Sequence, residues 1–153
     1  MTKILFLCHG NICRSPMAEF VMKKLVSDAG LTHRYVIDSA AVSREEIGNP
    51  IYPPARRTLN QHAIPFSDHR ARQVTEADCA SYDLIVCMDA SNIRILNRLC
   101  PQAIPSGKVH LLMDYAGQHR DVADPWYTDD FETTYRDLMT GCQALLQTLE
   151  GER

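Results

Sequence analysis

Residues 4–15 of the chain read Ile4-Leu5-Phe6-Leu7-Cys8-His9-Gly10-Asn11-Ile12-Cys13-Arg14-Ser15. The first four are apolar, which is typical of a strand buried on both faces, and the Pro16 behind the stretch suits the first position of a helix. A cysteine therefore ends a strand, and Arg14 and Ser15 begin a helix after five intervening residues. This order predicts an α/β fold with a polar loop beyond the carboxyl end of the first strand.

The loop between this strand and the helix has the composition of an anion site. Its backbone N–H groups can point inward, and the helix dipole adds a positive potential that favours a thiolate at Cys8. Arg14 offers a planar fork that can hold two phosphate oxygens. Taken singly, Cys8 would merely end a buried strand and Arg14 would be a surface charge, but their spacing favours a nucleophile beneath a bound phosphate. The expected phosphate-binding residues are His9, Gly10, Asn11, Ile12, Cys13, Arg14 and Ser15.

Composition and charge exclude several other classes of protein. The stretch lacks the Lys-Ser/Thr pair of a nucleoside-triphosphate loop and the G-x-G-x-x-G of a dinucleotide site. With 153 residues and a formal net charge of −3, we expect one domain (residues 1–153) and no nucleic-acid partner. No segment approaches the roughly 18 apolar residues of a membrane span, so no membrane association is expected. Six cysteines without a secretory signal favour a reducing, cytoplasmic setting over a disulfide scaffold.

Strand and helix patterns alternate along the chain. Strands are expected at Lys3–Cys8, Tyr35–Ser39, Tyr82–Met88 and Val109–Leu112. Helical segments are expected after Ser15, from near Pro54, at Thr75–Ala80 and after Asp89. A final helix carries an apolar stripe of Phe131, Tyr135, Leu138, Cys142, Leu145 and Leu149. This alternation predicts a mainly parallel sheet with helices on both faces.

The helix after the loop carries recognisable end signals. Ser15 is expected to cap its N-terminus, with Pro16 at the first helical position. Glu19 is expected in the first turn, where negative charge is favoured, and Gly30 is expected to end the helix. Asp89 is expected to cap a later helix in the same way.

Asp124-Pro125-Trp126-Tyr127 is the second segment with a chemical signature. Pro125 pushes Asp124 out of helical geometry and into an extended loop. The two aromatic residues offer an apolar wall for a substrate ring. On its own the segment would be a turn with two packing aromatic residues. Beside the Cys8 loop, and together with the family resemblance given next, Asp124 becomes the candidate general acid that protonates the leaving oxygen.

The chain resembles the low-molecular-weight protein tyrosine phosphatases. That family carries C-x5-R-S near its N-terminus, and the match here runs from Leu7 to Pro16. The resemblance continues in family order through Asp38–Ala41, Glu46–Pro50, His69–Gln73, Tyr82–Ile85, Met88–Asn92 and Asp124–Tyr127. It implies a single domain with a four-stranded parallel sheet, and an enzyme that hydrolyses phosphotyrosine.

The residues and the resemblance together imply a reaction in two steps. Cys8 attacks phosphorus while Arg14 and the loop amides hold the phosphate oxygens, and Asp124 protonates the leaving oxygen. A cysteinyl-phosphate forms, and water activated by Asp124 then releases inorganic phosphate. Arg14 and the amides supply the charge stabilisation that magnesium supplies elsewhere, so we expect no metal ion and no other cofactor.

The resemblance also assigns supporting roles around the loop. Asn11, Ser15, Ser39 and His69 match positions that form a hydrogen-bond network holding the loop in shape. Inward-pointing amides need polar groups outside the turn to fix it, and Ser15 can in addition donate to the thiolate. Outside this context Ser15 is equally a helix cap and His69 equally a loop histidine.

Cys13 is a candidate for redox protection of the nucleophile. It lies five residues along the chain from Cys8 in a tight loop, so the two Cα atoms could lie within the roughly 7 Å that a disulfide needs. Peroxide would oxidise Cys8 first, and Cys13 could trap the sulfenic acid as a reducible disulfide. The resemblance implies the same protection, and a small residue packed under the loop is the alternative.

The walls of the substrate cleft depart from the family pattern. Many members have an aromatic residue at the position of Glu45, where a carboxylate gives no stacking surface and would repel acidic peptides. Tyr52 is a candidate to replace that aromatic wall. The expected cleft residues are Glu45, Tyr52, Trp126 and Tyr127. We therefore expect a phosphotyrosine protein or a small aryl phosphate as substrate, with inorganic phosphate as product.

Two other functions remain open from the sequence. An arsenate reductase on the same scaffold would relay oxidation through two further cysteines, but the spacing of Cys79, Cys87 and Cys100 fits such a relay poorly. A non-catalytic phosphotyrosine-binding module would not need Cys8, and a phosphocarrier would not need Arg14 or a remote acid. The sequence does not determine assembly, and a monomer or weak self-association is expected.

Overall fold

The computed structural model describes residues 1–152, which form one four-stranded sheet and the helices around it. The strands are β1 (Thr2–Cys8), β2 (Tyr35–Ala41), β3 (Leu84–Cys87) and β4 (Val109–Leu111). The α-helices are α1 (Arg14–Asp28), α2 (Pro53–Gln61), α3 (Glu76–Ser81), α4 (Ala90–Leu99), α5 (Pro125–Thr128) and α6 (Phe131–Gly151). Short 3-10 helices span Thr32–Arg34 (η1) and Leu112–Ala116 (η2). The predicted α/β class and the four strands are confirmed.

The sheet is entirely parallel and runs in the order β2-β1-β3-β4. β1 therefore pairs on both sides, and its run from Ile4 to Cys8 is buried. The chain leaves β1 toward β2 and later returns on the other side as β3. Ligands in such sheets bind beyond the carboxyl ends of the strands at this reversal, which is where Cys8 ends β1.

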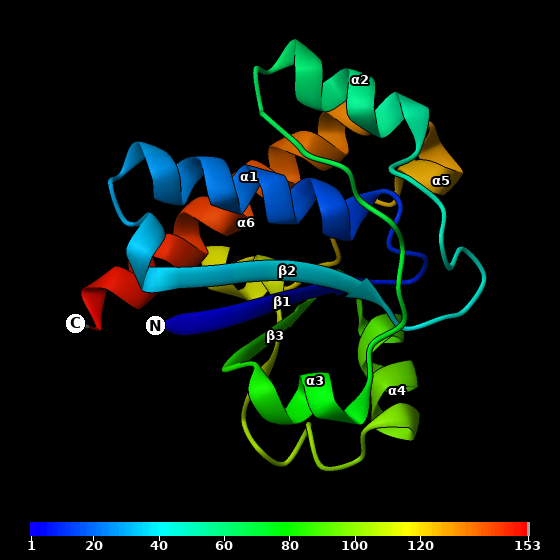
Figure 1. Cartoon of the computed structure of the whole chain (residues 1–153), viewed down its shortest axis with the longest axis vertical. Coiled ribbons are helices and arrows are strands. Elements are labelled where there is room, and N and C mark those ends of the chain that lie inside the picture. Colours follow the sequence, from blue (N-terminus) through cyan, green and yellow to red (C-terminus); the bar gives the residue numbers. More distant parts are fainter. Residues whose placement is uncertain (153) are drawn as a thin grey trace.

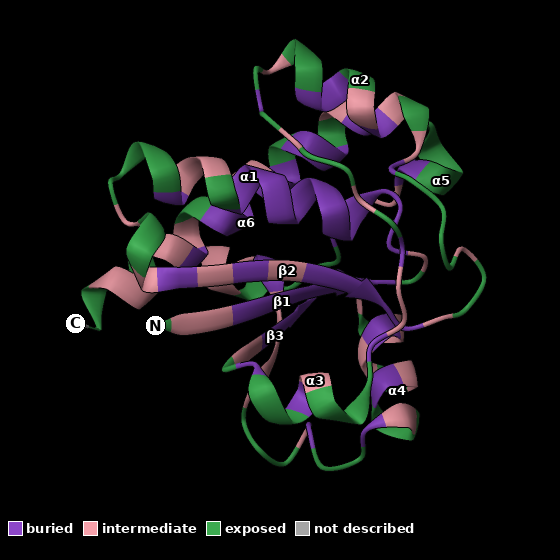
Figure 2. Ribbon diagram, in the orientation of Figure 1, coloured by how far each residue is buried: buried purple, intermediate pink, exposed green. Residues whose placement is uncertain are grey.

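Helices cover both faces of the sheet (Figure 1). The α1, α6 and α2 helices lie on one face, where the side chains of Ile4 and Phe6 join their core. The α3 and α4 helices lie on the other face, where Leu5 and Leu7 point. Successive strand side chains point to opposite faces, so the continuous apolar run of β1 supplies both cores. Figure 2 shows the resulting burial concentrated on the strands and on the first part of α1, residues 14–22.

Two helix starts were predicted correctly, and one was not. Thr75 caps α3 and Asp89 caps α4, each with a reciprocal capping box. Ser15, in contrast, lies inside α1, whose N-cap position is Cys13 without a side-chain cap. The Ser15 hydroxyl is turned toward the Cys8 sulfur instead, 3.0 Å away. The prediction of Glu19 in the first turn is also wrong, because α1 begins at Arg14 and has no acidic residue there.

The two ends of the chain meet on the side of the sheet away from Cys8. Thr2 at the start of β1 pairs with Tyr35 at the start of β2. The Tyr35 hydroxyl donates to Glu150 in the last turn of α6, and Arg34 adds an ion pair to the same carboxylate (2.6 Å). Figure 1 shows both termini on this side of the molecule.

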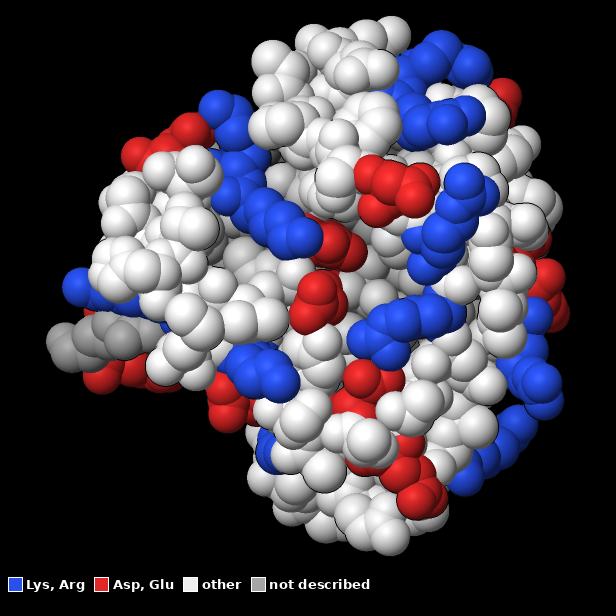
Figure 3. All heavy atoms as spheres, in the orientation of Figure 1, with Lys and Arg blue, Asp and Glu red and all other residues white. Residues whose placement is uncertain are grey.

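On the face drawn in Figure 3, basic and acidic side chains are interspersed rather than gathered into a patch of one sign. Within residues 1–152 there is no helix with the length and apolar character needed to cross a membrane.

Candidate active site

The loop from Cys8 to Ser15 is held from outside through its carbonyl groups. Its carbonyl oxygens accept hydrogen bonds from neighbouring segments at 2.8–3.1 Å: Cys8 from Val42, His9 from Ser43, Asn11 from His69 and Ile12 from Tyr52. Because these carbonyls turn outward, the N–H groups between them can face the centre of the loop. An array of inward N–H groups at a helix start is the arrangement that binds a tetrahedral anion.

Asn11 is the residue on which the shape of the loop depends. Its φ of 60° lies in the left-handed region, a conformation that asparagine tolerates better than most residues. Its side-chain amide donates to Ser15 Oγ (2.8 Å) and to Ser39 Oγ (3.0 Å). Its side-chain oxygen accepts from the N–H of Arg72 (3.2 Å). The structure thus brings Asn11, Ser15, Ser39 and His69 together around the loop.

The network ends on a buried carboxylate that the sequence did not reveal as part of the site. Glu19 is 7 % exposed and accepts a hydrogen bond from Ser39 Oγ at 2.6 Å. Its second oxygen pairs with Lys23 one helical turn later, also at 2.6 Å. A carboxylate can only accept, so the Ser39 hydroxyl must donate to it and must accept from Asn11. Glu19 therefore fixes the direction of the hydrogen bonds that reach Asn11.

The sulfur of Cys8 lies at the other end of this network. It accepts a hydrogen bond from the N–H of Asn11 at 3.2 Å and lies 3.0 Å from Ser15 Oγ. Since Asn11 already donates to the Ser15 oxygen, the single Ser15 hydroxyl proton can go to the Cys8 sulfur at 3.0 Å or to the carbonyl of Ala40 at 3.4 Å, and the shorter contact is the one to the sulfur. Two donors on one sulfur stabilise a thiolate. The Cys8 side chain is 4 % exposed at the floor of the cleft.

Arg14 is fixed by partners from two other segments. Its guanidinium donates to Asp89 Oδ2 (2.9 Å), to the carbonyl of Val122 (3.2 Å) and, more weakly, to Asp124 Oδ2 (3.4 Å). Burial opposes its charge, but the neighbouring negative charges of Cys8, Asp124 and Asp89 outweigh burial and hold the pKa of Arg14 above its usual value. Asp89 was predicted only as a helix cap. One of its oxygens does cap α4, and the other holds Arg14.

Asp124 reaches the cleft from a segment tied to both β3 and α6. The N–H of Val122 donates to the carbonyl of Met88 (2.9 Å), which anchors the segment beside β3. The N–H of Ala123 donates to Asp137 of α6 (2.9 Å). Asp124 itself caps α5, because its Oδ1 accepts from the N–H of Trp126 at 3.0 Å. The other oxygen faces Arg14, so Asp124 and Arg14 share the cleft with Cys8.

The cleft above Cys8 has a volume of about 470 Å³. Its walls include Trp126 and Tyr127, which are 59 % and 86 % exposed, and Glu45 with Glu46 on the opposite rim. Glu45 pairs with the ring of His9 at 2.9 Å. Gly10 permits this rim to approach, because a Cβ there would lie only 3.2 Å from Glu46 Cγ.

Tyr52 was predicted in the cleft, but the structure places it behind the cleft wall. Its ring lies 5.5 Å from the Trp126 ring and 6.1 Å from the Phe131 ring. It is not among the residues that line the cleft. Tyr52 begins α2, and its backbone N–H is engaged by the loop carbonyl of Ile12. The Tyr52 ring therefore packs beside Trp126 and Phe131 without lining the cleft.

The other thiols are buried. Cys13 is 8 % exposed, and burial together with the neighbouring Cys8 raises the pKa of Cys13 to about 12. Cys79, Cys87 and Cys100 are at most 8 % exposed, with Cys87 inside β3. Within residues 1–152, no group of three or more His, Cys, Asp or Glu side chains is arranged to hold a metal ion.

Comparisons with known proteins agree with this geometry. Residues 3–153 match the sequence model of the low molecular weight phosphotyrosine protein phosphatases. The human low molecular weight phosphotyrosine protein phosphatase is 45 % identical over 148 residues, covering 94 % of this chain and 93 % of its own. The crystal structure of YfkJ from Bacillus subtilis superposes with a TM-score of 0.94 at 37 % identity, covering 100 % of this chain and 97 % of its own.

A further solved structure contains a ligand. Wzb of Vibrio vulnificus in complex with benzylphosphonate is 31 % identical, has a TM-score of 0.84 and covers 96 % of this chain and 98 % of its own. The sequence match extends over nearly the whole chain, and the fold match includes the sheet and the helices around it. By sequence and by fold, this chain belongs to the low molecular weight phosphotyrosine protein phosphatase family.

Proposed function

We propose that this protein hydrolyses phosphotyrosine and small aryl phosphates through a cysteinyl-phosphate intermediate. One observation carries the proposal: a buried cysteine sulfur with two hydrogen-bond donors shares one cleft with a fixed arginine and an aspartate. A thiolate, a phosphate clamp and a proton donor are the groups that this chemistry requires. Benzylphosphonate, in which one methylene joins an aromatic ring to the phosphonate, is bound by the related Wzb and is consistent with an aromatic phosphate ester as ligand.

In the first step, the Cys8 thiolate attacks phosphorus in line with the leaving oxygen. The S–P bond forms, the P–O bond to the aryl group breaks, and Asp124 gives its proton to the departing phenolate. The loop N–H groups and Arg14 hold the remaining phosphate oxygens. In the unliganded cleft Asp124 contacts Arg14 at 3.4 Å. An incoming phosphate dianion competes with Asp124 for Arg14.

In the second step, water attacks the cysteinyl-phosphate. Asp124, now a carboxylate, accepts a proton from this water as the new P–O bond forms. The S–P bond breaks, the thiolate of Cys8 is restored, and inorganic phosphate leaves. Ser15, which lies 3.0 Å from the sulfur, stabilises the departing thiolate by donating to it.

The burial of the remaining cysteines argues against an arsenate reductase. Such a reductase needs further thiols that can reach the oxidised nucleophile in succession. Cys87, the last residue of β3, is 0 % exposed, and it lies with Cys79 and Cys100 in the core on the α3 and α4 face of the sheet. Burial also holds the pKa of Cys87 above its ordinary value, which disfavours the reactive thiolate.

The proposed function is tested by metal-independent hydrolysis of p-nitrophenyl phosphate and a phosphotyrosine peptide in the presence of EDTA. Cys8→Ser is expected to abolish turnover of both substrates while retaining vanadate binding. Cys142→Ala, which removes a buried thiol of α6 far from the cleft, serves as the matched control and is expected to retain turnover. Absence of turnover by the freshly reduced wild-type protein would refute the proposal.

Oxidation provides a second test of the loop. We expect peroxide to convert the Cys8 thiolate to a sulfenic acid with release of water, and Cys13 to displace a second water as the disulfide forms. Because the pKa of Cys13 is raised to about 12, little thiolate is present and this trap should close slowly. Activity lost to peroxide should return with dithiothreitol in the wild type but not in Cys13→Ser. Equal recovery in both proteins would exclude Cys13 from this role.

The proposal also includes a cytoplasmic location and a monomeric or weakly self-associating state. A reduced Cys8 is required for activity, which fits a reducing cytoplasm. The exposed Trp126 and Tyr127 beside the cleft contact the substrate protein, and we expect a monomer or weak self-association in solution. Light scattering of the wild type across a concentration series measures the latter directly.

A further inference from the structure

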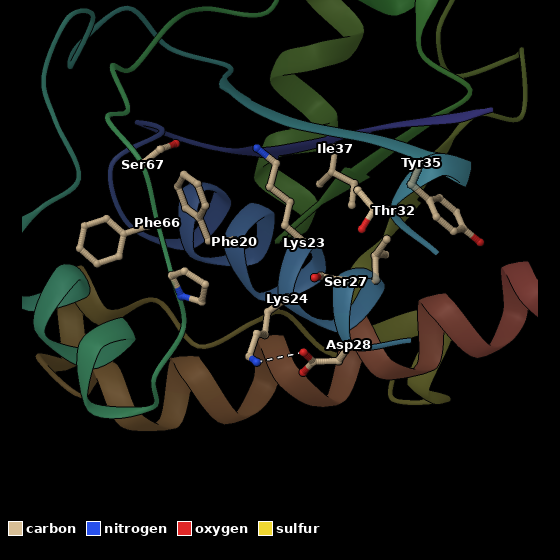
Figure 4. Close-up of a pocket in the computed structure, with 12 residues that line it drawn as sticks. Phe20, Lys23, Lys24, Ser27, Asp28, Thr32, Tyr35, Ile37, Phe66 and Ser67 are labelled. Carbon is tan, nitrogen blue, oxygen red and sulfur yellow. Dashed lines mark hydrogen bonds and ion pairs between the residues drawn. The ribbon is translucent and has the colours of Figure 1, made fainter. Parts of the chain in front are cut away.

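A second hollow lies on the outer face of α1, away from the catalytic cleft. It has a volume of about 600 Å³ and lies between the start of β2 and the segment Pro65–Ser67. Figure 4 shows its lining, with Phe20 and Lys23 from α1, Phe66 from that segment, and Tyr35 and Ile37 from β2. The hollow is large enough for a small aromatic ligand, and none of its lining residues lines the catalytic cleft.

One end of this hollow is aromatic. The rings of Phe20 and Phe66 meet edge to face, with centroids 6.2 Å apart and an angle of 61° between their planes. Phe20 is buried at 4 % exposure, whereas Phe66 is only partly buried against the core. Paired rings of this kind favour another planar ring in edge or offset contact. The shape and the chemistry of this end suit a flat, apolar group.

Three charged residues, Lys23, Lys24 and Asp28, line the hollow, and Lys23 is the one at its aromatic end. Its ammonium lies 5.1 Å from the centroid of the Phe20 ring and pairs with Glu19 at 2.6 Å. An ammonium has three N–H donors, so the bond to Glu19 leaves donors for a ligand. Lys24 also lines the hollow, but Figure 4 shows it turned away from Lys23 toward Asp28, with which it pairs at 3.0 Å. An anion beside Phe20 would therefore meet Lys23 and not Lys24.

Lys23 is also the outer end of the hydrogen-bond network that holds the phosphate loop. The bonds run from Lys23 to Glu19, from Glu19 to Ser39, and from Ser39 to Asn11. The Asn11 amide then reaches Ser15, which lies against the Cys8 sulfur. An anion that binds the Lys23 ammonium weakens the ion pair between Lys23 and Glu19. Because Glu19 sets the direction of these bonds, the effect is carried to the donors on Cys8.

We propose that this hollow binds a small aromatic carboxylate, with its ring against Phe20 and Phe66 and its carboxylate on Lys23, and that the bound ligand lowers turnover at Cys8. The ligand class follows from the juxtaposition of one aromatic end with one ammonium. The coupling follows from the shared carboxylate of Glu19.

Indole-3-acetate is a suitable probe, with indole-3-acetamide as its neutral counterpart. Binding is measured by amide chemical-shift changes in enzyme saturated with vanadate, which blocks the catalytic cleft. We expect a dissociation constant on the order of 1 mM for indole-3-acetate, typical of a ligand of this size. Binding of indole-3-acetamide should be about fivefold weaker, since it lacks the charge that pairs with Lys23. Phe66→Ala should weaken binding of both probes.

The two lysines provide a matched pair of variants. Lys23→Gln should weaken indole-3-acetate about fivefold and leave indole-3-acetamide unchanged, whereas Lys24→Gln should alter neither. In steady-state assays with p-nitrophenyl phosphate, saturating indole-3-acetate should lower kcat about fivefold in the wild type, the small end of measured couplings between sites. Lys23→Gln removes the same support of Glu19, so its basal kcat should already be lowered, and saturating indole-3-acetate should lower it no further.

Three results would overturn the proposal. Shift changes that vanish in vanadate-saturated enzyme would place the probe in the catalytic cleft. Equal affinity for the acid and the amide would show that Lys23 does not recognise an anion. Binding in the hollow with unchanged kcat would refute the coupling through Glu19.

Discussion

The two walls of the catalytic cleft are built in opposite ways. The phosphate loop is buried throughout from Asn11 to Ser15, and neighbouring segments bind its carbonyl groups. The wall that carries Asp124 is exposed over Trp126 and Tyr127 and contains a helix of only four residues. The Cys8 loop is therefore held by buried contacts, whereas the wall with Asp124 is exposed and is held by hydrogen bonds to Met88, Asp137 and Arg14. Groups that stabilise charge must be held in fixed positions. A wall that admits and releases substrate does not need the same rigidity.

The largest expected effect comes from removing the carboxylate of Asp124 from the exposed wall. Asp124→Ala removes the proton donor, so kcat on a phosphotyrosine peptide should fall by roughly 10²–10⁴-fold. The loss on p-nitrophenyl phosphate should be smaller, because nitrophenolate leaves more readily without protonation. Steady-state kinetics on both substrates measure the difference, and Asp68→Ala, an exposed carboxylate elsewhere, is the control. Equal losses on the two substrates would contradict the role of Asp124 as acid.

The next effect tests whether the buried wall depends on Glu19. In Glu19→Gln, one of the two amide atoms meets the wrong partner: the –NH₂ faces either Lys23 or the Ser39 hydroxyl, both of which now donate. We expect kcat to fall about tenfold with KM little changed, because the substitution removes the free energy of about one to two hydrogen bonds from the network. Asp28→Asn, an exposed carboxylate of the same helix, should leave kcat unchanged. A normal kcat in Glu19→Gln would remove Glu19 from the network's function.

A third test concerns the anchor of the exposed wall. Asp137 accepts two hydrogen bonds from Arg120 (2.9 and 2.8 Å) and one from the N–H of Ala123, directly before Asp124. Although burial opposes its charge, these bonds lower the pKa of Asp137 below its ordinary value. Asp137→Asn should reduce the free energy of unfolding by about 1–2 kcal/mol at pH 7 and should lower kcat a few-fold.

The pH dependence of the stability difference between wild type and Asp137→Asn follows from the lowered pKa of Asp137. A carboxyl whose folded pKa is depressed stabilises the protein fully above its unfolded pKa of about 3.9. That contribution is lost as the pH falls through the lower folded pKa. Urea unfolding should therefore show a constant gap between wild type and Asp137→Asn from pH 7 to pH 5 and a shrinking gap below about pH 4. A gap that widens on acidification would contradict the assignment.

The smallest expected effect concerns the rim of the cleft. Glu45 is well exposed and pairs with the exposed His9, so its charge acts on substrate only through water. Glu45→Gln should raise kcat/KM about twofold for a phosphopeptide with acidic neighbours and leave p-nitrophenyl phosphate unchanged. The gain should disappear at high salt. Glu76→Gln, an exposed carboxylate at the start of α3, is the matched control.

Most of the fold could be predicted from local patterns. The strands are apolar runs and α6 has one apolar stripe, so the spacing of the apolar residues identifies these elements. Cys8, Arg14 and Asp124 stand out because each belongs to a short motif whose residues act together. The sheet order then brings the ends of β1 and β3 to the same edge, where Asp89 reaches Arg14.

The features that escaped prediction all depend on packing between distant segments. A glutamate in a helix is usually solvated, and only the arrival of Ser39 from β2 reveals Glu19 as a buried acceptor. Ser15 fits a helix cap as well as a thiolate donor, and the start of α1 at Arg14 decides between them. Tyr52 was placed in the cleft because an aromatic wall was missing there, but its contact with Phe131 holds it behind Trp126.

The meeting of the two chain ends has a practical consequence. Thr2 pairs beside Tyr35, whose hydroxyl reaches Glu150, while Cys8 lies at the opposite end of the same strand. A fusion partner, an affinity tag or a surface tether attached at either end would project away from the cleft. A short linker between the ends would close the chain into a ring, so the protein is a good scaffold for circular permutation.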